Sequence, residues 1–179
     1  NGVTSIGFAA FSNCNALESI TLPFVGQYAD GSGKTHFGYI FGAQNSNYNV
    51  DDVPISLKEV IITNGDVIYS DAFFYCSSLT SITIPDSVTH IGFNAFFGCN
   101  GLTSVTLPDT LISIGSSAFA ECNKLSSITI PEGITIIESG VFNSCYKLTS
   151  VTLPNTLTSI SAGAFIDCRN LQTINIPES

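Results

Sequence analysis

The stretch LTSVTLPDTLISIGSSAFAEC, which spans residues 102–122, decides the fold of this chain. Val105 and Leu107 alternate with small polar residues, as expected of a short strand with one buried face. Pro108 has no N–H group to donate, so the strand is expected to end there and the chain to turn. Apolar groups then return to the interior, and residues 116–122 are expected to form a short helical turn.

The same pattern recurs with a fixed period of 23 residues. Cysteines, leucines, prolines and phenylalanines all keep one register along the chain. Its members are Cys76, Cys99, Cys122, Cys145 and Cys168; Leu79, Leu102, Leu125, Leu148 and Leu171; Pro85, Pro108, Pro131, Pro154 and Pro177; and Phe96, Phe119, Phe142 and Phe165. So many positions shared at one period define a repeat array.

One repeat cannot cover its own apolar side, so neighbouring repeats must stack in register to hide it. Adjacent strands then lie roughly 4.8 Å apart. The sequence therefore predicts a solenoid of parallel strands with rows of Leu, Ile, Phe and Cys inside. The strand frames begin at Leu17, Leu57, Leu79, Leu102, Leu125, Leu148 and Leu171.

Residues 24–56 form an irregular long unit that interrupts the period. Leu57 follows Leu17 by 40 residues instead of 23. We expect residues 1–179 to form a single array with an insertion in this unit. Because the chain begins inside a repeat and stops just after Pro177, we also expect it to be a fragment of a longer protein.

The repeat from Leu102 to Cys122 resembles the 23-residue leucine-rich repeat of the BspA-like (Treponema-type) family, and the resemblance covers nearly the whole chain. It implies an α/β leucine-rich repeat solenoid. Such a solenoid has a curved parallel sheet on the concave face, with short strands, turns and short helical turns elsewhere. The resemblance also implies secreted or surface-attached proteins of anaerobic bacteria and some parasitic protists, associated with adhesion. The family has no shared catalytic motif.

These observations favour a non-enzymatic extracellular or cell-surface recognition module that binds protein or glycan on host or neighbouring cells. The alternative is a structural spacer within a larger surface protein. An enzyme is disfavoured, because the two histidines, His36 and His90, lie far apart and no acid, base and nucleophile are grouped. We expect no catalytic residue, no cofactor and no metal.

The charge and hydropathy of the chain exclude further classes of partner. The chain has 14 acidic and five basic residues, a net charge of −9. This argues against nucleic acid or anionic lipid, because phosphate binding needs clustered Lys and Arg. The longest unbroken apolar run is residues 72–76, so no segment is expected to span a membrane.

The exposed face of the predicted strands carries a regular array of small hydroxyl residues, which suits the concave docking surface of a binding solenoid. A flat Thr array is also suited to ice binding, but the curvature that the family implies disfavours it. The array lacks the aromatic and Arg anchors that dominate interaction hot spots. The candidate partner-binding residues on it are Ser81, Thr83, Ser104, Thr106, Ser127, Thr129, Ser150 and Thr152.

The long unit supplies a second set of candidates, because extra residues in one repeat usually emerge as loops on one face. Phe37, Ile40 and Phe41 are expected to fill this unit's share of the core. The remaining candidates either bind a partner or lie in a plain solvated loop. They are Tyr28, Tyr48, Asp51 and Asp52.

Three other patterns are expected to be structural. The cysteines follow the repeat and would point the same way, so we expect buried free thiols rather than disulfides. Gly33-Lys34-Thr35 lacks the earlier glycine and the following helix of a phosphate-binding loop. Asp86, Asp109, Glu132, Asn155 and Glu178 would align along the turns as a solvated edge, with weak divalent-cation binding as the alternative.

Overall fold

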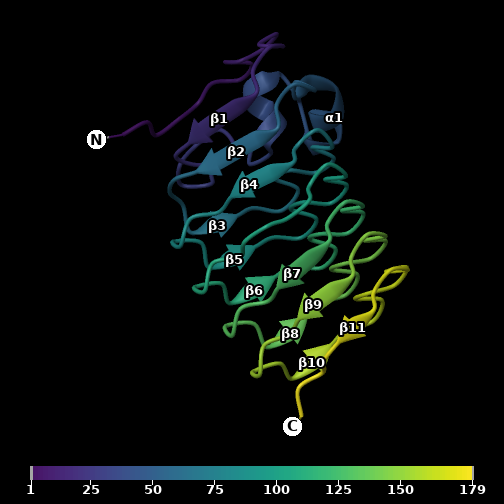
Figure 1. Ribbon diagram of the computed structural model, residues 1–179. Coiled ribbons are helices and arrows are strands. Elements are labelled where there is room, and N and C mark those ends of the chain that lie inside the picture. The colour runs from purple at the N-terminus through teal and green to yellow at the C-terminus, as the bar shows by residue number, and fades with distance from the viewer. Residues whose placement is uncertain (1, 179) are drawn as a thin grey trace.

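The computed structural model describes residues 2–178 and shows a solenoid of parallel β-strands (Figure 1). Successive repeats stack from the purple N-terminal end to the yellow C-terminal end, each as one coil of the chain. The predicted leucine-rich repeat solenoid is confirmed. We call the repeats coils and name them by their residues, for example coil 102–124 and coil 125–147.

Two rows of short strands run along the stack, and every pairing between strands in them is parallel. The first strand row contains β1 (Ser19–Leu22), β2 (Glu59–Ile62), β4 (Ser81–Thr83), β7 (Ser127–Thr129), β9 (Ser150–Thr152) and β11 (Thr173–Ile174). The second strand row contains β3 (Val67–Ile68), β5 (His90–Ile91), β6 (Ser113–Ile114), β8 (Ile136–Ile137) and β10 (Ser159–Ile160). Within each strand the residue that faces the core is apolar, as the predicted alternation requires.

Both strand rows are interrupted at coil 102–124: the first on both sides of residues 104–107, and the second between this coil and coil 125–147. The first row divides into β1-β2-β4 and β7-β9-β11, and the second into β3-β5-β6 and β8-β10. The strand predicted at residues 104–107 is therefore wrong in one respect: the segment lies in the first row but pairs with neither neighbour. Val105 is half-buried as a result, whereas Ile82 and Ile128 at the same register are buried.

The third side of each coil is a series of tight turns, which corrects the helical turn predicted for residues 116–122. Phe119 donates its N–H to the carbonyl oxygen of Val141 in the next coil at 3.0 Å. Ala120 instead donates within its own coil, to Ser117, at 3.1 Å. This alternation requires left-handed backbone at Ser117 (φ 57°) and Glu121 (φ 58°), which a helix cannot contain.

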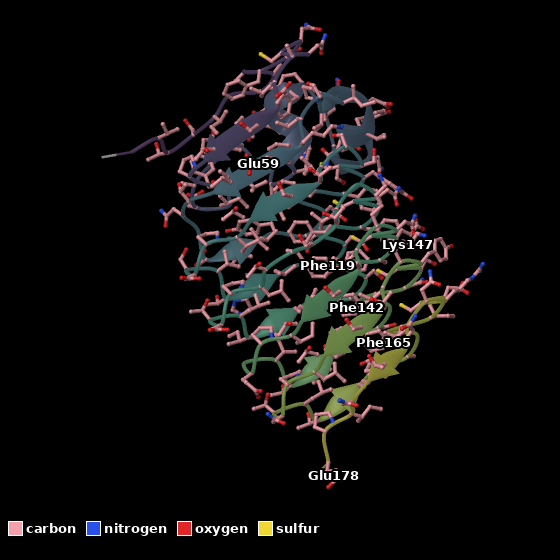
Figure 2. All side chains as sticks on the ribbon, viewed as in Figure 1. Glu59, Phe119, Phe142, Lys147, Phe165 and Glu178 are labelled. Atoms are coloured by element: carbon pink, nitrogen blue, oxygen red, sulfur yellow. The ribbon has the colours of Figure 1, made fainter. Side chains whose placement is uncertain are left out.

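The core is a continuous column of apolar side chains inside the coils. The rings of Phe73, Phe96, Phe119, Phe142 and Phe165 stack nearly parallel, with centroid separations of 5.0–5.9 Å. Figure 2 shows Phe119, Phe142 and Phe165 following one another along the stack. The widest separation, 5.9 Å, lies between Phe119 and Phe142, across the interruption of the strand rows.

The long unit folds against the N-terminal end of the column. It forms η1 (Phe37–Phe41), η2 (Ser46–Tyr48) and α1 (Asn49–Asp52). Phe37, Ile40 and Phe41 are buried, as predicted. Among residues 2–178, no helix is both long and apolar enough to cross a lipid bilayer.

Candidate interaction surface

The hydroxyl residues predicted on the strand face form one continuous surface along the first strand row. Six of the eight are exposed, and Ser81 and Ser150 are half-buried. None of the eight side chains makes a hydrogen bond to any part of the chain that the structure describes. We call this surface, made of Ser81, Thr83, Ser104, Thr106, Ser127, Thr129, Ser150 and Thr152, the hydroxyl face.

A second row of hydroxyls, one residue before each of these strand segments, behaves differently. Thr80, Thr103, Ser126 and Thr149 each donate a side-chain hydrogen bond to a carbonyl oxygen of the preceding coil, at 3.0–3.4 Å. This row therefore ties coil to coil. The hydroxyl face is not used in that way, so its donors and acceptors are available to a partner.

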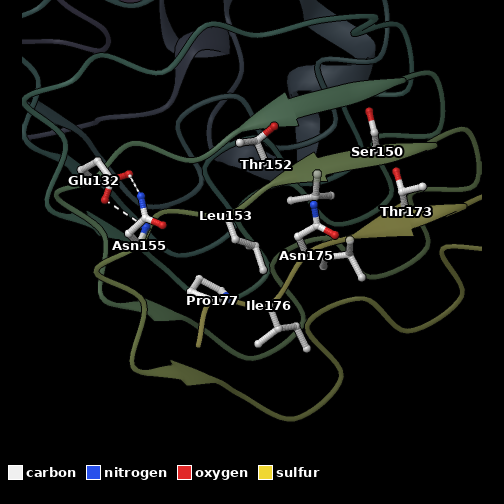
Figure 3. Close-up of a pocket in the computed structure, with 11 residues that line it drawn as sticks. Glu132, Ser150, Thr152, Leu153, Asn155, Thr173, Asn175, Ile176 and Pro177 are labelled. Atoms are coloured by element: carbon white, nitrogen blue, oxygen red, sulfur yellow. Dashed lines mark hydrogen bonds between the residues drawn. The ribbon is translucent and has the colours of Figure 1, made fainter. Parts of the chain in front are cut away.

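Two grooves cross the hydroxyl face. The first, of about 400 Å³, lies between segments 104–109 and 127–131 and coincides with the interruption of the strand rows. The second, of about 450 Å³, lies between segments 150–155 and 173–177 (Figure 3). The two grooves are related by two repeats of the sequence, and both place hydroxyl groups beside apolar side chains.

The coil boundary between the two grooves is closed. Ile130 donates its N–H to the carbonyl oxygen of Thr152 at 2.9 Å. Glu132 accepts hydrogen bonds from both the main-chain N–H and the side-chain amide of Asn155, at 3.0 and 3.2 Å (Figure 3). The Glu132 carboxylate is therefore engaged by the wall of the second groove.

The candidate residues of the long unit are split between two places. Tyr28 lines a small recess together with Val67 and Tyr69, around β3. Tyr48, Asp51 and Asp52 lie on η2 and α1, and Figure 1 shows α1 at the opposite margin of the stack from β3. All four are exposed, but they do not form one site.

The loop that contains Tyr28 is bound to the body of the solenoid. Tyr28 bridges Ser5 in antiparallel fashion, and the Tyr69 hydroxyl donates to the carbonyl oxygen of Asp30 at 3.4 Å. Gly31 packs so closely on the Tyr69 ring that a side chain there would have to displace the ring. The loop thus covers β3, the edge strand of the second row, where an unpaired edge would otherwise be exposed.

His36 is buried in the long unit and has a structural partner. One of its ring nitrogens, Nε2, lies 3.0 Å from the carbonyl oxygen of Ala43. Burial lowers the pKa of His36, because the charged form would lose its hydration. The unfolded chain therefore takes up this proton first, so the stability that neutral His36 confers is complete above about pH 6.5 and declines as the pH falls.

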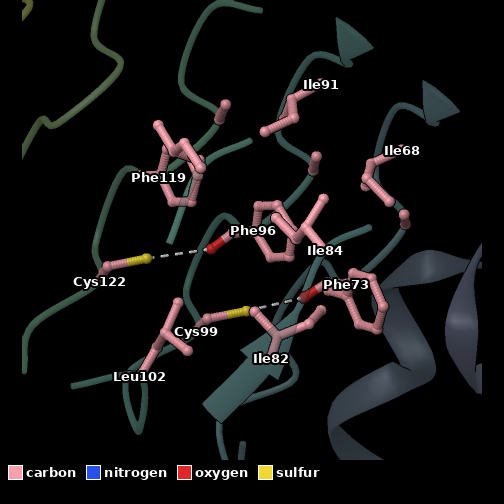
Figure 4. Packing of buried hydrophobic residues seen from close by; sticks show 14 of the residues in the cluster. Ile68, Phe73, Ile82, Ile84, Ile91, Phe96, Cys99, Leu102, Phe119 and Cys122 are labelled. Atoms are coloured by element: carbon pink, nitrogen blue, oxygen red, sulfur yellow. Dashed lines mark hydrogen bonds between the residues drawn. The ribbon is translucent and has the colours of Figure 1, made fainter. Parts of the chain in front are cut away.

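The repeated cysteines are part of the core. Cys76, Cys99, Cys122 and Cys145 are buried, as predicted, whereas Cys168 is half-buried and Cys14 is exposed, which corrects the prediction for those two. Thiols donate to phenylalanine carbonyls of the preceding coil, Cys99 to Phe73 at 3.2 Å and Cys122 to Phe96 at 3.3 Å (Figure 4). All six are free thiols in the structure.

We expect thiol labelling to separate these cysteines. Burial raises the pKa of Cys99 and Cys122 far above the ordinary thiol value and that of Cys145 to about 12, so almost no thiolate forms at pH 8. A maleimide should modify Cys14 at once and Cys168 slowly in the native protein, and all six residues in guanidinium chloride. Peptide mapping by mass spectrometry checks this, and native labelling of Cys99 would contradict it.

The acidic turn residues form a solvated edge. Asp86, Asp109, Glu132 and Glu178 are exposed, as is Asn155. Within residues 2–178, no three His, Cys, Asp or Glu side chains are grouped so that they could hold a metal ion. Two residues of this edge contact each other: Asn155 donates two hydrogen bonds to the Glu132 carboxylate.

Sequence reasoning missed three features of this surface. It selected the hydroxyls of the strand face but did not foresee that those one residue earlier, such as Thr80 and Thr149, donate to a carbonyl oxygen of the preceding coil. It also placed Asp109 on the turn edge, whereas this residue lines the first groove. The uninterrupted 23-residue period gave no sign that pairing fails at residues 104–107.

A stack of parallel coils with an apolar column inside and a free hydroxyl face outside defines a leucine-rich repeat solenoid. The sequence model of the BspA type leucine rich repeat region matches residues 1–29 and 66–179, in six copies. The chain therefore belongs to this family. The unmatched residues, 30–65, contain most of the long unit, and the match indicates no enzymatic family.

Solved structures with the same fold come from several bacteria. The chain is 37% identical to a leucine-rich repeat protein of T. pallidum, with a TM-score of 0.61 over 63% of this chain and 56% of that one. A leucine-rich cell surface protein of Faecalibacterium prausnitzii is 28% identical, with a TM-score of 0.62 over 93% of this chain and 47% of that one. A leucine-rich repeat protein of Bacteroides ovatus is 26% identical, with a TM-score of 0.61 over 99% and 53%.

The chain spans about half the length of each of these structural relatives. No curated protein matches it.

Proposed function

We propose that this chain is a recognition module of a secreted or cell-surface protein, and that it binds a protein partner through the hydroxyl face. The observation that carries the proposal is the contrast between the two hydroxyl rows. The hydroxyls of one row donate hydrogen bonds that hold neighbouring coils together. The hydroxyls of the other row make no hydrogen bond to the chain and lie on an exposed surface. Leucine-rich repeat solenoids present extended surfaces of this kind to their ligands.

The chemistry of the grooves supports a protein partner rather than a glycan. Each groove combines hydroxyl groups with exposed parts of Val, Ile or Leu side chains, a mixture that resembles the rest of a protein surface. Neither groove is lined by an aromatic ring. The location of the module on a cell is supported by its family and by the relative from F. prausnitzii that is described as a cell surface protein.

A pair of matched variants tests the proposal. Thr129 lies on the hydroxyl face, whereas Thr135 is an exposed threonine just before β8 in the second strand row. Thr129→Tyr should block the face without adding charge, and Thr135→Tyr adds the same bulk elsewhere. We expect Thr129→Tyr to reduce partner affinity at least tenfold and Thr135→Tyr to leave it unchanged, because a partner seated on the face cannot avoid the new ring.

The measurement uses the parent and both variants immobilised side by side, with solubilised surface proteins of epithelial and bacterial cells applied to each. Quantitative mass spectrometry identifies proteins retained by the parent and by Thr135→Tyr but lost from Thr129→Tyr, and interferometry with the purified partner gives the affinities. Partners retained equally by all three forms would show that binding uses another surface. Retention of no protein would favour the spacer.

A further inference from the structure

The first groove owes its shape to the way coil 125–147 sits on coil 102–124. At one corner of neighbouring coils, a serine or threonine at one register (Ser87, Thr110 or Thr156) ties its coil to the preceding one. Thr110 and Thr156 each donate to two carbonyl oxygens there, at 2.6–3.1 Å. Coil 125–147 has Gly133 at this register, so it lacks that hydroxyl, and a side chain at Gly133 would collide with the Leu111 carbonyl. The coils therefore approach closely at this corner, and the groove lies beside it along the first strand row.

Main-chain groups of residues 104–107 are unpaired in the groove. No N–H or C=O group of residues 104–107 makes a hydrogen bond with any of residues 2–178. Beside them lie the hydroxyls of Ser104, Thr106 and Thr129, which are equally unused. Polar main-chain groups that lack a partner in the protein must be satisfied by water or by a ligand.

The charge of the groove selects the kind of ligand. Asp109 lines it and makes no ion pair, and the one ion pair among residues 2–178 joins Arg169 to Asp167. No Lys or Arg lines the groove, and the chain carries a net charge of −9, which attracts cations toward it. A groove that is lined by an exposed carboxylate and by hydroxyl and main-chain carbonyl groups matches a donor-rich cation, and the guanidinium group offers five N–H donors.

We propose that the groove between segments 104–109 and 127–131 receives an arginine side chain of the protein partner, with Asp109 as its counter-ion. This inference rests on the proposed function and names the chemistry of the contact. The second groove serves as an internal contrast, because its carboxylate, Glu132, is already held by Asn155. The first groove is therefore the preferred arginine site.

The test uses a defined probe rather than the unknown partner. The blocked pentapeptide acetyl-Gly-Gly-Arg-Gly-Gly-amide is titrated into the 15N-labelled chain, with the Gln analogue as the neutral control. We expect saturable amide shift changes that are largest in segments 104–109 and 127–131 and that are absent with the Gln peptide. Asp109→Asn should weaken the Arg peptide about fivefold, and added salt should weaken it in the parent.

Asp86→Asn is the matched charge control, because Asp86 occupies the same register one coil earlier and lines neither groove. It should leave the affinity of the Arg peptide within twofold of the parent. Equal weakening by both variants would show diffuse attraction to an acidic surface, and shifts centred on segments 150–155 and 173–177 would place the cation in the second groove. Either result overturns the proposal.

The outcome is separable from that of the proposed function. If Thr129→Tyr abolishes partner binding while Asp109→Asn has no effect on the partner or the peptide, the hydroxyl face stands as the interface and the arginine site does not. If neither substitution affects the partner, both proposals fail together.

Discussion

Replacing Phe119 with Ala lowers the free energy of unfolding by about 3–5 kcal/mol. The side chain is completely buried, and its ring stacks on Phe96 at 5.0 Å and on Phe142 at 5.9 Å. Truncation therefore removes the transfer free energy of a large apolar group and opens a cavity between two coils that cannot close without breaking the ladder from Phe119 to Val141. Urea unfolding followed by circular dichroism measures the loss.

Phe93→Ala is the control for this experiment, because Phe93 is half exposed and lies outside the column of stacked rings. It should cost less than about 1 kcal/mol, since the same atoms are removed without leaving a closed cavity. An equal loss of unfolding free energy in the two variants would mean that the stacked rings contribute no more to stability than an exposed ring does.

Replacing Asn49 with Leu lowers the free energy of unfolding by about 2–4 kcal/mol. Asn49 is completely buried, accepts a hydrogen bond from the N–H of Gly38 and donates one to the carbonyl oxygen of Phe74, both at 2.9 Å. Leucine has a similar size but leaves both main-chain groups without a partner. The bonded groups join η1 to the repeat that follows the long unit, so hydrogen exchange in residues 37–52 should rise together with the loss of stability.

Asn47→Leu is the matched control, because Asn47 is exposed in η2, two residues away. Its side chain should tolerate the change within about 0.5 kcal/mol. A fall in stability of the same size in both variants would assign the effect to solubility or helix propensity instead of the buried hydrogen bonds.

The core was predictable because stacking packs each apolar side chain against the side chain at the same position in the next coil. Leu102, Phe119 and Cys122 are buried for the reason that their period implies: each lies between copies of itself. The same logic failed for Cys14, which lies in the N-terminal part of the described chain and is exposed. Periodicity determines which way a residue points, and burial also needs a neighbour on each side.

The surface was less predictable. A sequence period identifies the positions that repeat, whereas the candidate site depends on positions at which one repeat differs from the others. Thr103 and Ser104 are adjacent small hydroxyl residues, yet one ties two coils together and the other is free. The difference arises from the direction of each side chain relative to the preceding coil. The groove lies beside the coil in which Gly133 takes the place of the serine or threonine found at this register in other coils.

Asn49 shows the same limit in the long unit. Nothing in the local sequence Asn45-Ser-Asn-Tyr-Asn49 distinguishes the last asparagine from the others, and such a segment predicts no more than a flexible turn. Its role follows from Gly38 and Phe74, which lie 11 and 25 residues away. Contacts at such separations are set by tertiary packing, which local propensity does not encode.

The ladder of hydrogen bonds from coil to coil has a mechanical consequence. These bonds run along the axis of the stack, from Phe96 to Ala118 and from Phe119 to Val141, so tension applied to the two ends loads them a few at a time. The chain should then peel open coil by coil instead of rupturing as a whole. Each step through the regular coils, from Leu79 onward, would release 23 residues, about 80 Å of extended polypeptide. Under load, the regular coils should therefore lengthen the chain in equal increments. A single-molecule force–extension curve would show these increments as evenly spaced unfolding peaks.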